Sequence, residues 1–265
     1  MTGLLPEQRR QFIIDTIKKN FTARSSELSQ QLNVSEMTIR RDLGVLEEEG
    51  ILKRTHGGAV YRQERMADKY KYQNSVKKSR GIKKRLARKA AGLIQPKDVV
   101  LIGEGSTASL ILRYVDPDIP FMAFTNNLGV AAEVDKRDLK AELIFLGGTY
   151  NSTTYATAGN LTYEMIERIN ANKVFFSVDG FSISSGLTVV NQEIAAINRA
   201  MVRRTNGMVA IMLDLSRFGL VAPIEVATTK EIDVLIVEKQ LPKTVTDELK
   251  DLGIDVLMSE FTAAD

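Results

Sequence analysis

The sequence of 265 residues contains no cysteine and a single histidine, His56. The lack of cysteine excludes a disulfide framework and a thiolate nucleophile, and one histidine is too few for an ordinary zinc site. Long apolar runs are also absent: the longest stretch without a charge, residues 143–163, is filled with Gly, Thr, Ser and Asn and cannot span a bilayer. The first residues contain no apolar segment of signal-peptide length. We therefore expect a cytoplasmic protein that uses no metal ion and no other cofactor.

Charge is distributed unevenly along the chain. Residues 1–95 hold 21 Lys and Arg against 10 Asp and Glu, whereas the remainder holds 15 against 23. The length favours two domains, and the charge separation indicates that only the first part meets a polyanion. The alternative is that these charges are simply solvated helix faces.

Three helices are predicted in the basic part. The first, over residues 5–20, starts at a proline, and the second runs from Ser25 or Ser26 to Leu32. The third has Ser35 as its N-cap and ends at Gly50, a typical helix stop. In that helix Ile39, Leu43 and Leu46 share one side and are expected to pack on the other two helices.

The opposite side of the third helix suits DNA. Arginine donates two hydrogen bonds to a guanine edge or binds phosphate, and a helix preceded by a tight turn presents its first residues to the major groove. The three glutamates at 47–49 are expected to point away from DNA, since a polyanion would repel them. The candidate DNA contacts on this helix are Ser35, Met37, Thr38, Arg40 and Arg41.

A two-stranded hairpin is predicted after Gly50, with its tip near Gly57 and Gly58. This hairpin would form a wing whose glycines allow close approach to DNA, while Lys53, Arg54 and His56 border the phosphate backbone. A structural role for the histidine is an equally open alternative. Helix, turn, Arg-rich helix and basic hairpin, in this order, predict a winged helix-turn-helix domain.

Residues 35–60, SEMTIRRDLGVLEEEGILKRTHGGAV, resemble the signature of the DeoR family of bacterial transcriptional regulators. The likeness extends from about residue 5 to residue 61, and we assign residues 1–62 to the DNA-binding domain. The resemblance implies a C-terminal sensor domain that binds a phosphorylated sugar or a related metabolite.

A basic linker is predicted over residues 63–79, and a helix over 80–94 begins the second domain. Residues 69–89 contain ten Lys and Arg and no acidic residue. Ile82, Leu86, Leu93 and Ile94 recur at roughly helical spacing, so this helix is expected to pack on the sensor domain with its basic face exposed. Supplementary contact of these cations with DNA phosphates is the alternative.

Short apolar runs alternate with helical segments from residue 98 onward. This order predicts, over residues 80–265, an α/β domain with a mainly parallel sheet. Ligands bind beyond the carboxyl ends of the strands in such sheets, and several of the runs end in small or polar residues. These ends are GEGST, TNN, GGT, DGFS and DLSRFG.

The segment GEGSTA at 103–108 has the features of a phosphate site. Glycines at a strand end, followed by Ser106 and Thr107 at an expected helix start, offer amide N–H groups, hydroxyls and a helix dipole. A plain strand-to-helix turn is one alternative. Another is a dinucleotide site, because the segment fits GxGxxA; that interpretation requires an acidic residue after the next strand, where Thr125, Asn126 and Asn127 stand instead.

The second half also resembles the DeoR-family sensor domain, over about residues 75–260. GEGST stands where the family usually has Asp-x-Gly-Ser-Thr, so Glu104 replaces an aspartate that would accept bonds from sugar hydroxyls. Arg217 stands where lysine is common as a phosphate partner, and arginine changes the reach of that charge. Arg217 could instead form an ion pair with a carboxylate such as Glu225. The resemblance implies a ligand site that contains Glu104, Gly105, Ser106, Thr107, Thr125, Asn126, Asn127, Gly148, Asp179 and Arg217.

The sensor domain is also expected to be sugar-phosphate-isomerase-like in fold. An isomerase would need carboxylates beside the substrate, and Asp179 and Glu193 are candidates. Fold does not carry activity, however, and a sensor gains from not consuming its ligand, so we expect no enzyme. The interpretation that we favour is a repressor of a sugar-metabolism operon, released from its DNA operator by a phosphorylated sugar. We expect a homodimer or homotetramer, because one winged helix reads too few base pairs.

Overall fold

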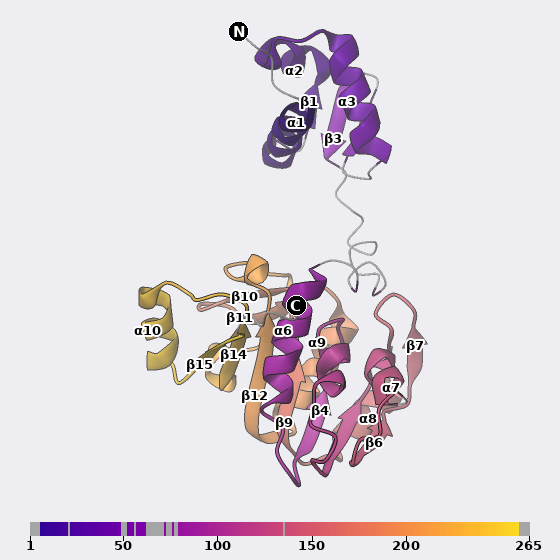
Figure 1. Ribbon diagram of the computed structural model, residues 1–265, viewed down its shortest axis with the longest axis vertical. Coiled ribbons are helices and arrows are strands. Elements are labelled where there is room, and N and C mark those ends of the chain that lie inside the picture. The colour runs from indigo at the N-terminus through magenta and orange to yellow at the C-terminus, as the bar shows by residue number, and fades with distance from the viewer. Residues whose placement is uncertain are drawn as a thin grey trace. The chain divides into compact units, whose positions relative to one another are not determined.

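A computed structural model describes residues 6–20, 22–48, 52–55, 57–61, 72, 76, 79–134 and 136–259. The chain divides into two compact units, Met1–Lys69 and Tyr70–Asp265, both drawn in Figure 1. Within the described residues, no helix has the length and apolar character that crossing a membrane requires.

The first unit consists of three helices and a small antiparallel sheet. Its helices bury their apolar sides against one another: Ile13, Leu28, Ile39 and Leu43 are at most 1% exposed. The predicted third helix therefore packs through the expected side. The sheet has the order β1-β3-β2, and its first strand was not predicted. The elements are α1 Pro6–Asn20, β1 Thr22–Arg24, α2 Ser25–Leu32, α3 Glu36–Glu48, β2 Leu52–Thr55 and β3 Gly58–Tyr61.

A buried ion pair joins the first and third helices. Arg9 Nε donates to Asp42 Oδ2 at 2.5 Å, and the two side chains are only 12% and 7% exposed. This hydrogen bond raises the pKa of Arg9. Removing one partner of such a pair leaves a buried charge uncompensated, so the pair fixes how α3 lies on α1.

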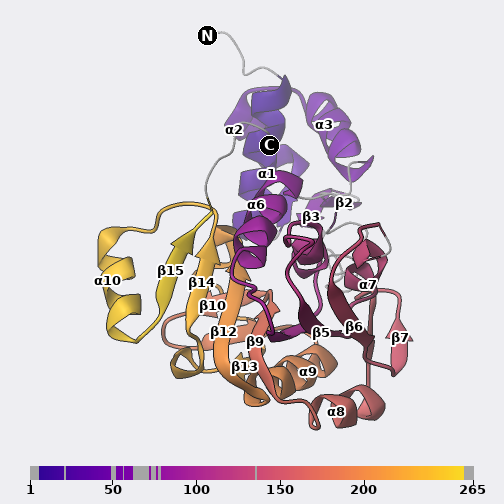
Figure 2. The same ribbon diagram turned by 60° about the horizontal axis from the view of Figure 1, so that its bottom comes forward.

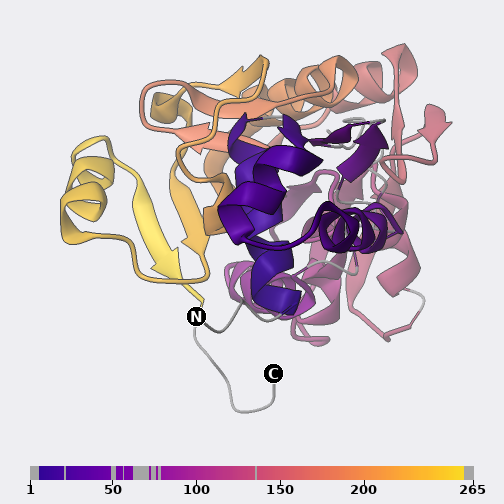
Figure 3. The same ribbon diagram turned by 90° about the horizontal axis from the view of Figure 1, so that it is seen from above.

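The second unit is built on a seven-stranded parallel sheet, as predicted. Its order is β15-β14-β12-β9-β4-β5-β6, with the C-terminal strand, yellow in Figure 3, at one edge. The chain starts in β4, adds β5 and β6 on one side, and then returns to place β9 and the later strands on the other side. The strands are β4 Val99–Ile102, β5 Phe121–Thr125, β6 Ala141–Phe145, β9 Ala171–Phe176, β12 Thr205–Leu213, β14 Val234–Val237 and β15 Asp255–Met258.

Helices cover both faces of this sheet because strand residues alternate between two apolar clusters. Val100 and Ile102 face a cluster that includes Leu86 of α6, whereas Leu101 faces the cluster that contains Ala195 of α9. Figure 2 shows α8 and α9 together, beside β9 and β13. The first face carries α6 Arg80–Ala91, the 3₁₀ helix η1 Ala108–Arg113 and α7 Leu128–Val134; the second carries α8 Asn160–Ile166, α9 Gln192–Arg203 and α10 Lys243–Asp251.

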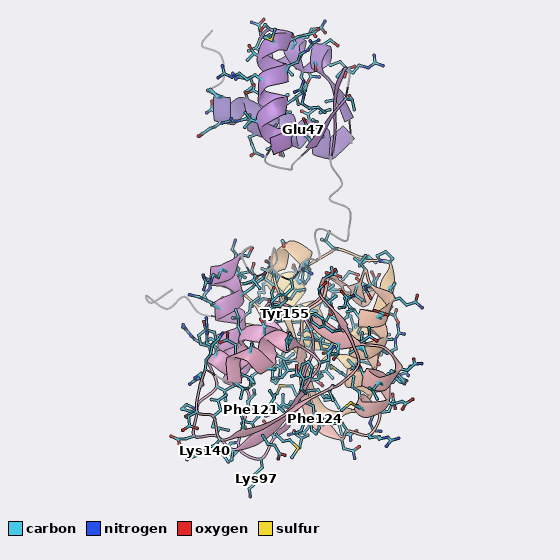
Figure 4. All side chains as sticks on the ribbon, turned by 90° about the vertical axis from the view of Figure 1, so that its right-hand side faces the viewer. Glu47, Lys97, Phe121, Phe124, Lys140 and Tyr155 are labelled. Atoms are coloured by element: carbon cyan, nitrogen blue, oxygen red, sulfur yellow. The ribbon has the colours of Figure 1, made fainter. Side chains whose placement is uncertain are left out.

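Two small sheets complete the unit. A hairpin joins β7 Thr149–Asn151 to β8 Ala156–Ala158, and a three-stranded sheet joins β10 Gly180–Ser182, β11 Gly186–Val189 and β13 Ile224–Ala227. Figure 4 shows Tyr155, in the turn of the hairpin, far from Lys97, Phe121 and Lys140, which stand where strands begin. The hairpin turn therefore lies toward the carboxyl ends of the strands, the edge where α/β proteins bind ligands.

Candidate functional site

The start of α3 has the geometry of a capped, outward-facing helix. Ser35 Oγ accepts from the Thr38 N–H at 3.2 Å and contacts the Thr38 hydroxyl at 3.0 Å, so the predicted N-cap is present. Met37 is 74% exposed, and Arg40 and Arg41 are exposed. Arg40 is 3.4 Å from Glu36, an exposed pair of little energetic value, and Arg41 has no ion pair within the described part of the chain.

The wing contributes a further cation to this surface. Arg54 Nη1 lies 3.8 Å from the position that a Cβ on Gly44 would occupy, on the same side of α3 as Arg41. The Arg54 backbone N–H donates to Glu47 Oε1 at 2.9 Å, so this glutamate is bound to the wing. Lys53 is in β2, and His56 lies outside the described residues.

The two glycines of the wing differ in their surroundings. A Cβ on Gly58 would lie 2.1 Å from the carbonyl oxygen of Ala23 in β1, whereas nothing is within 4 Å of the corresponding position on Gly57. Gly58 therefore permits the close approach of β1, a packing role. Gly57 faces open space at that position, and its carbonyl accepts from the Ser25 N–H at 2.9 Å.

The GEGST segment forms a turn at the end of β4. Gly105 has a φ of +109°, and a Cβ there would lie 2.6 Å from Ser177 Oγ, so only glycine fits. The backbone N–H groups of Glu104, Gly105 and Thr107 have no acceptor among the described residues. The expected α-helix at Ser106 is absent: the Ser109 hydroxyl instead donates to the Ser106 carbonyl at 3.0 Å, and a six-residue 3₁₀ helix starts at Ala108. Its short length makes the predicted dipole contribution small.

The TNN segment, which begins with the last residue of β5, supports that turn. Thr125 Oγ1 donates to the Ile102 carbonyl at 2.7 Å, and Asn127 Nδ2 donates to the carbonyls of Gly103 and Gly105 at 3.3 and 3.1 Å. Both side chains are fully buried. Asn126 lines a pocket.

This pocket lies between the GEGST turn, the β7–β8 hairpin and the start of α9. It brings together two predicted ligand residues, Glu104 and Asn126, and Glu193, a candidate carboxylate of the isomerase alternative, with other polar side chains that the sequence patterns did not single out. Asn191 caps α9 by accepting from Glu193 N at 2.8 Å and Ile194 N at 3.1 Å, a signal that Asn followed by Gln-Glu could have given. The lining residues are Glu104, Asn126, Asn151, Thr154, Thr157, Ala158, Asn191, Glu193, Ile194 and Ile197.

Burial controls the charge of Glu104. Burial, together with the nearby negative charge of Asp179, raises the pKa of this carboxyl to about 8. At neutral pH the side chain is therefore mostly protonated and can donate a hydrogen bond. It has no hydrogen-bond partner among the described residues.

Arg217 and Asp179, predicted from separate loops, meet in an ion pair. Arg217 Nη1 lies 2.7 Å from Asp179 Oδ1 and 2.5 Å from the Val178 carbonyl oxygen. The carboxylate beside Arg217 is thus Asp179, not Glu225. Neither residue lines the pocket. At Gly148, with a φ of +144°, a Cβ would lie 2.0 Å from Thr162 Oγ1, so a side chain does not fit there.

No group of three or more His, Asp or Glu side chains that could hold a metal ion occurs among the residues that the structure describes. The arrangement instead offers hydroxyl, amide and carboxyl groups in the pocket, N–H groups of Glu104, Gly105 and Thr107 without acceptors in that part of the chain, and a cationic surface on the first unit.

Known proteins resemble both units. Residues 9–65 match the family profile described as the DeoR-like helix-turn-helix domain, and residues 78–239 match the DeoR C-terminal sensor domain. The transcriptional regulator GolR of Listeria innocua is 30% identical over 97% of this chain and 100% of its own length. The lactose phosphotransferase system repressor of Streptococcus mutans is 29% identical over 80% of this chain and 84% of its own.

An activator and a solved structure are also similar. The L-fucose operon activator of Haemophilus influenzae is 29% identical over 88% of this chain and 92% of its own. Ribose 5-phosphate isomerase A of Methanocaldococcus jannaschii aligns with a TM-score of 0.37 and 14% identity, over 52% of this chain and 54% of its own. Because both family profiles match in order and the sensor profile alone covers more than half of the residues, the chain belongs to the DeoR family of transcriptional regulators.

Proposed function

We propose that this regulator represses a sugar-utilisation operon and leaves its operator when a phosphorylated sugar binds the second unit. The observation that carries the proposal is the pocket at the carboxyl edge of the sheet. Its lining is rich in hydroxyl, amide and carboxyl groups, and the GEGST turn beside it supplies N–H groups without acceptors. Polar groups of this kind bind sugar hydroxyls, and free N–H groups bind phosphate oxygens.

The names of the relatives support a sugar-linked function. The similar proteins include a lactose phosphotransferase system repressor and an L-fucose operon activator. The sign of regulation thus differs between relatives. Release of the operator by an effector would make this chain a repressor, whereas tighter binding would make it an activator.

For the first unit, we propose that Arg41 and Arg40 enter the major groove while Lys53, Arg54 and His56 border the phosphates. Exposure of the two helix arginines and the position of Arg54 beside Gly44 support this orientation. Ser35, Met37 and Thr38 would stand at the helix end nearest the DNA. Paired half-sites would then require a homodimer or a homotetramer.

For the second unit, we propose that Glu104 and Asn126 bind the sugar and that Gly105, Ser106 and Thr107 bind the phosphate. Arg217 would add a cation, shared with Asp179, from the adjoining loop. Thr125, Asn127 and Gly148 would hold the loops in place through the contacts described above.

A dinucleotide effector is a second candidate. The observation that favours it is the strand order around β4 and β9, where the chain reverses as it does in dinucleotide-binding sheets. Thr125 weakens it, because β5 ends there without an acidic residue for the ribose hydroxyls.

A thermal-shift screen of the full chain tests these candidates. Pentose and hexose phosphates, NADH and NADPH are compared at equal concentration, since a ligand that favours the folded state raises its stability. Each hit is then added to the protein bound to operator DNA. We expect a sugar phosphate to raise the melting temperature and to release the DNA. If only a dinucleotide stabilises the protein, the effector is a dinucleotide and not a sugar phosphate. Sustained turnover of a sugar phosphate would identify an enzyme.

A further inference from the structure

Two buried asparagines beside the pocket have amide atoms that lack hydrogen-bond partners within the described part of the chain. Asn198 of α9 is 0% exposed, and neither atom of its amide has a partner among the described residues. Asn126 is 2% exposed, and its Oδ1 also lacks one. Glu104, as described, makes no hydrogen bond. Because buried polar groups are nearly always satisfied, unsatisfied amide atoms on two buried asparagines, next to the partly buried carboxyl of Glu104, indicate that a ligand completes them.

Asn198 is adjacent to the pocket but is not itself one of its lining residues. Asn198 Oδ1 lies 3.3 Å from the position of a Cβ on Gly103, the residue before Glu104. Its neighbours in α9, Ile194 and Ile197, line the pocket together with Glu104 and Asn126. Gly103 therefore leaves space between the turn after β4 and the side-chain amide of Asn198.

The orientation of the Asn126 amide follows from its surroundings. Its Nδ2 donates to the Thr157 carbonyl at 2.8 Å, and a carbonyl can only accept. Oδ1 is consequently the end left without a partner, and it can only accept. Asn198 offers both a donor and an acceptor, and protonated Glu104 does the same.

This set of groups suits hydroxyls better than phosphate. Sugar hydroxyls both donate and accept hydrogen bonds, so they can pair with Asn198, Asn126 and Glu104. A phosphate dianion would instead meet the negative charge of Asp179, which already raises the pKa of Glu104, and Glu193 in the pocket wall.

We propose that Asn198, with Asn126 and Glu104, forms a hydroxyl-recognition subsite that selects the uncharged, polyhydroxylated part of the effector. Asn198 is the new member of the site and a specificity-determining residue. The proposal rests on the proposed function in taking a phosphorylated sugar as the effector. Replacing Asn198 by leucine, an apolar side chain of similar shape, would remove its hydrogen bonds to the effector without leaving a cavity.

Asn198→Leu tests the proposal in the full-length protein, with Asn198→Ala as a smaller variant that cannot clash. Asn206→Ala is the matched control, because Asn206 is an exposed asparagine near the start of β12. The melting temperature is measured without ligand and in titrations with a panel of pentose and hexose phosphates. Inorganic phosphate serves as the probe without hydroxyls.

We expect Asn198→Leu to melt at or above the wild-type temperature, because an unsatisfied buried amide is replaced by a side chain without polar atoms. The apparent affinity for the sugar phosphates should fall at least tenfold in both variants, while that for inorganic phosphate stays within twofold. The control should match wild type in all measurements.

Two results would overturn the subsite alone: sugar-phosphate affinities of both Asn198 variants equal to wild type, or a melting temperature of Asn198→Leu well below that of the control. The second result would mean that Asn198 stabilises the fold. If no sugar phosphate binds the wild-type protein, the proposed function fails together with the subsite.

Discussion

At the scale of single residues, Glu104 links the stability of the fold to pH. Its pKa is about 8 in the folded chain against an ordinary value of 4.5, so the folded state holds the proton more tightly between these values. The stabilisation that protonated Glu104 contributes is fully present below about pH 4.5 and is lost as the pH rises toward 8. Glu104→Gln should abolish this decline, because the amide does not bind the proton.

Urea unfolding at intervals between pH 5 and pH 8.5 measures the effect. The difference in unfolding free energy between wild type and Glu104→Gln should shift in favour of the variant as the pH rises. A difference that does not change with pH would show that Glu104 titrates normally.

Loss of the Arg41 side chain is predicted to weaken DNA recognition. Its side chain is exposed and projects from the side of α3 opposite the buried Ile39 and Leu43. If it makes a bidentate base contact, Arg41→Ala should weaken operator binding by about 1 to 3 kcal/mol without changing the melting temperature. Titration of labelled operator measures this loss. Arg168→Ala, which removes an equal charge from an exposed site in the second unit, should bind as wild type.

The double alanine variant of Arg40 and Arg41 gives the clearest negative outcome. Operator affinity equal to wild type in that variant would exclude α3 as the recognition helix.

Arg217 gives a prediction for the phosphate. Arg217→Ala should weaken sugar-phosphate binding strongly while operator affinity is retained, so the regulator would stay on DNA when effector is present. Arg217→Lys should recover part of the affinity, since the charge returns without the two-pronged guanidinium. Calorimetric titration compares the variants with Arg203→Ala, an exposed control. Equal affinities in wild type and Arg217→Ala would restrict Arg217 to its pairing with Asp179.

At the scale of elements, the wing depends on one of its two glycines. Gly58→Ala should destabilise the first unit, because the new methyl group would overlap the Ala23 carbonyl and displace β1 from β3. Gly57→Ala is the matched control and should leave the fold intact. Thermal unfolding of the full chain measures both. Similar melting curves for the two variants would mean that β1 can shift without loss.

The sequence predicts the long elements well and the short ones poorly. Helices α1 to α3 and α9 and the buried strands are evident because their apolar residues repeat with the period of a helix or form continuous runs. Strands of three residues, such as β1, β7 and β10, carry too few residues for a periodic signal. Their pairing depends on partners that are distant in the chain.

The same limit applies to the candidate site. Glu104 and Asn126 could be predicted because each follows a strand, where parallel sheets place ligands. The hairpin over 149–158 and the start of α9 reach the pocket only through tertiary packing. Asn198 is hidden from sequence reasoning for a further reason, since a polar residue in a helix is ordinarily read as solvent-exposed.

At the scale of the whole molecule, an effector must influence a DNA-binding domain at the other end of the chain. Tyr72, in the predicted linker, is bound to the loops of the candidate site. Its N–H donates to the Thr153 carbonyl at 2.7 Å, and its ring stacks on Tyr155 with centroids 4.6 Å apart. Burial raises the pKa of Tyr72, partly opposed by a hydrogen bond with Ser109.

These contacts connect the linker to the pocket through several loops. Thr154, between the two residues that hold Tyr72, lines the pocket, and the Ser109 hydroxyl is bonded to Ser106 of the GEGST turn. An effector that draws these loops together would therefore alter the position of Tyr72 as well as that of the helix α6 that follows it. Linkage then requires operator and effector to change each other's affinity by the same factor.

We expect Tyr72→Ala to uncouple the two units. The measured quantity is the ratio of operator dissociation constants with and without the sugar phosphate found in the screen, and couplings of this kind are typically about 5- to 150-fold. In Tyr72→Ala the ratio should approach one, while each ligand still binds its own unit. Tyr72→Phe should keep most of the coupling because the stacked ring remains, and Tyr163→Ala, on the exposed side of α8, should behave as wild type.

A chain ending near Gln73 should bind DNA weakly and respond to no sugar phosphate. If Tyr72→Ala retains the wild-type ratio, the signal passes through α6 without the linker tyrosine, and if the truncated chain responds, the sensor lies in the first unit.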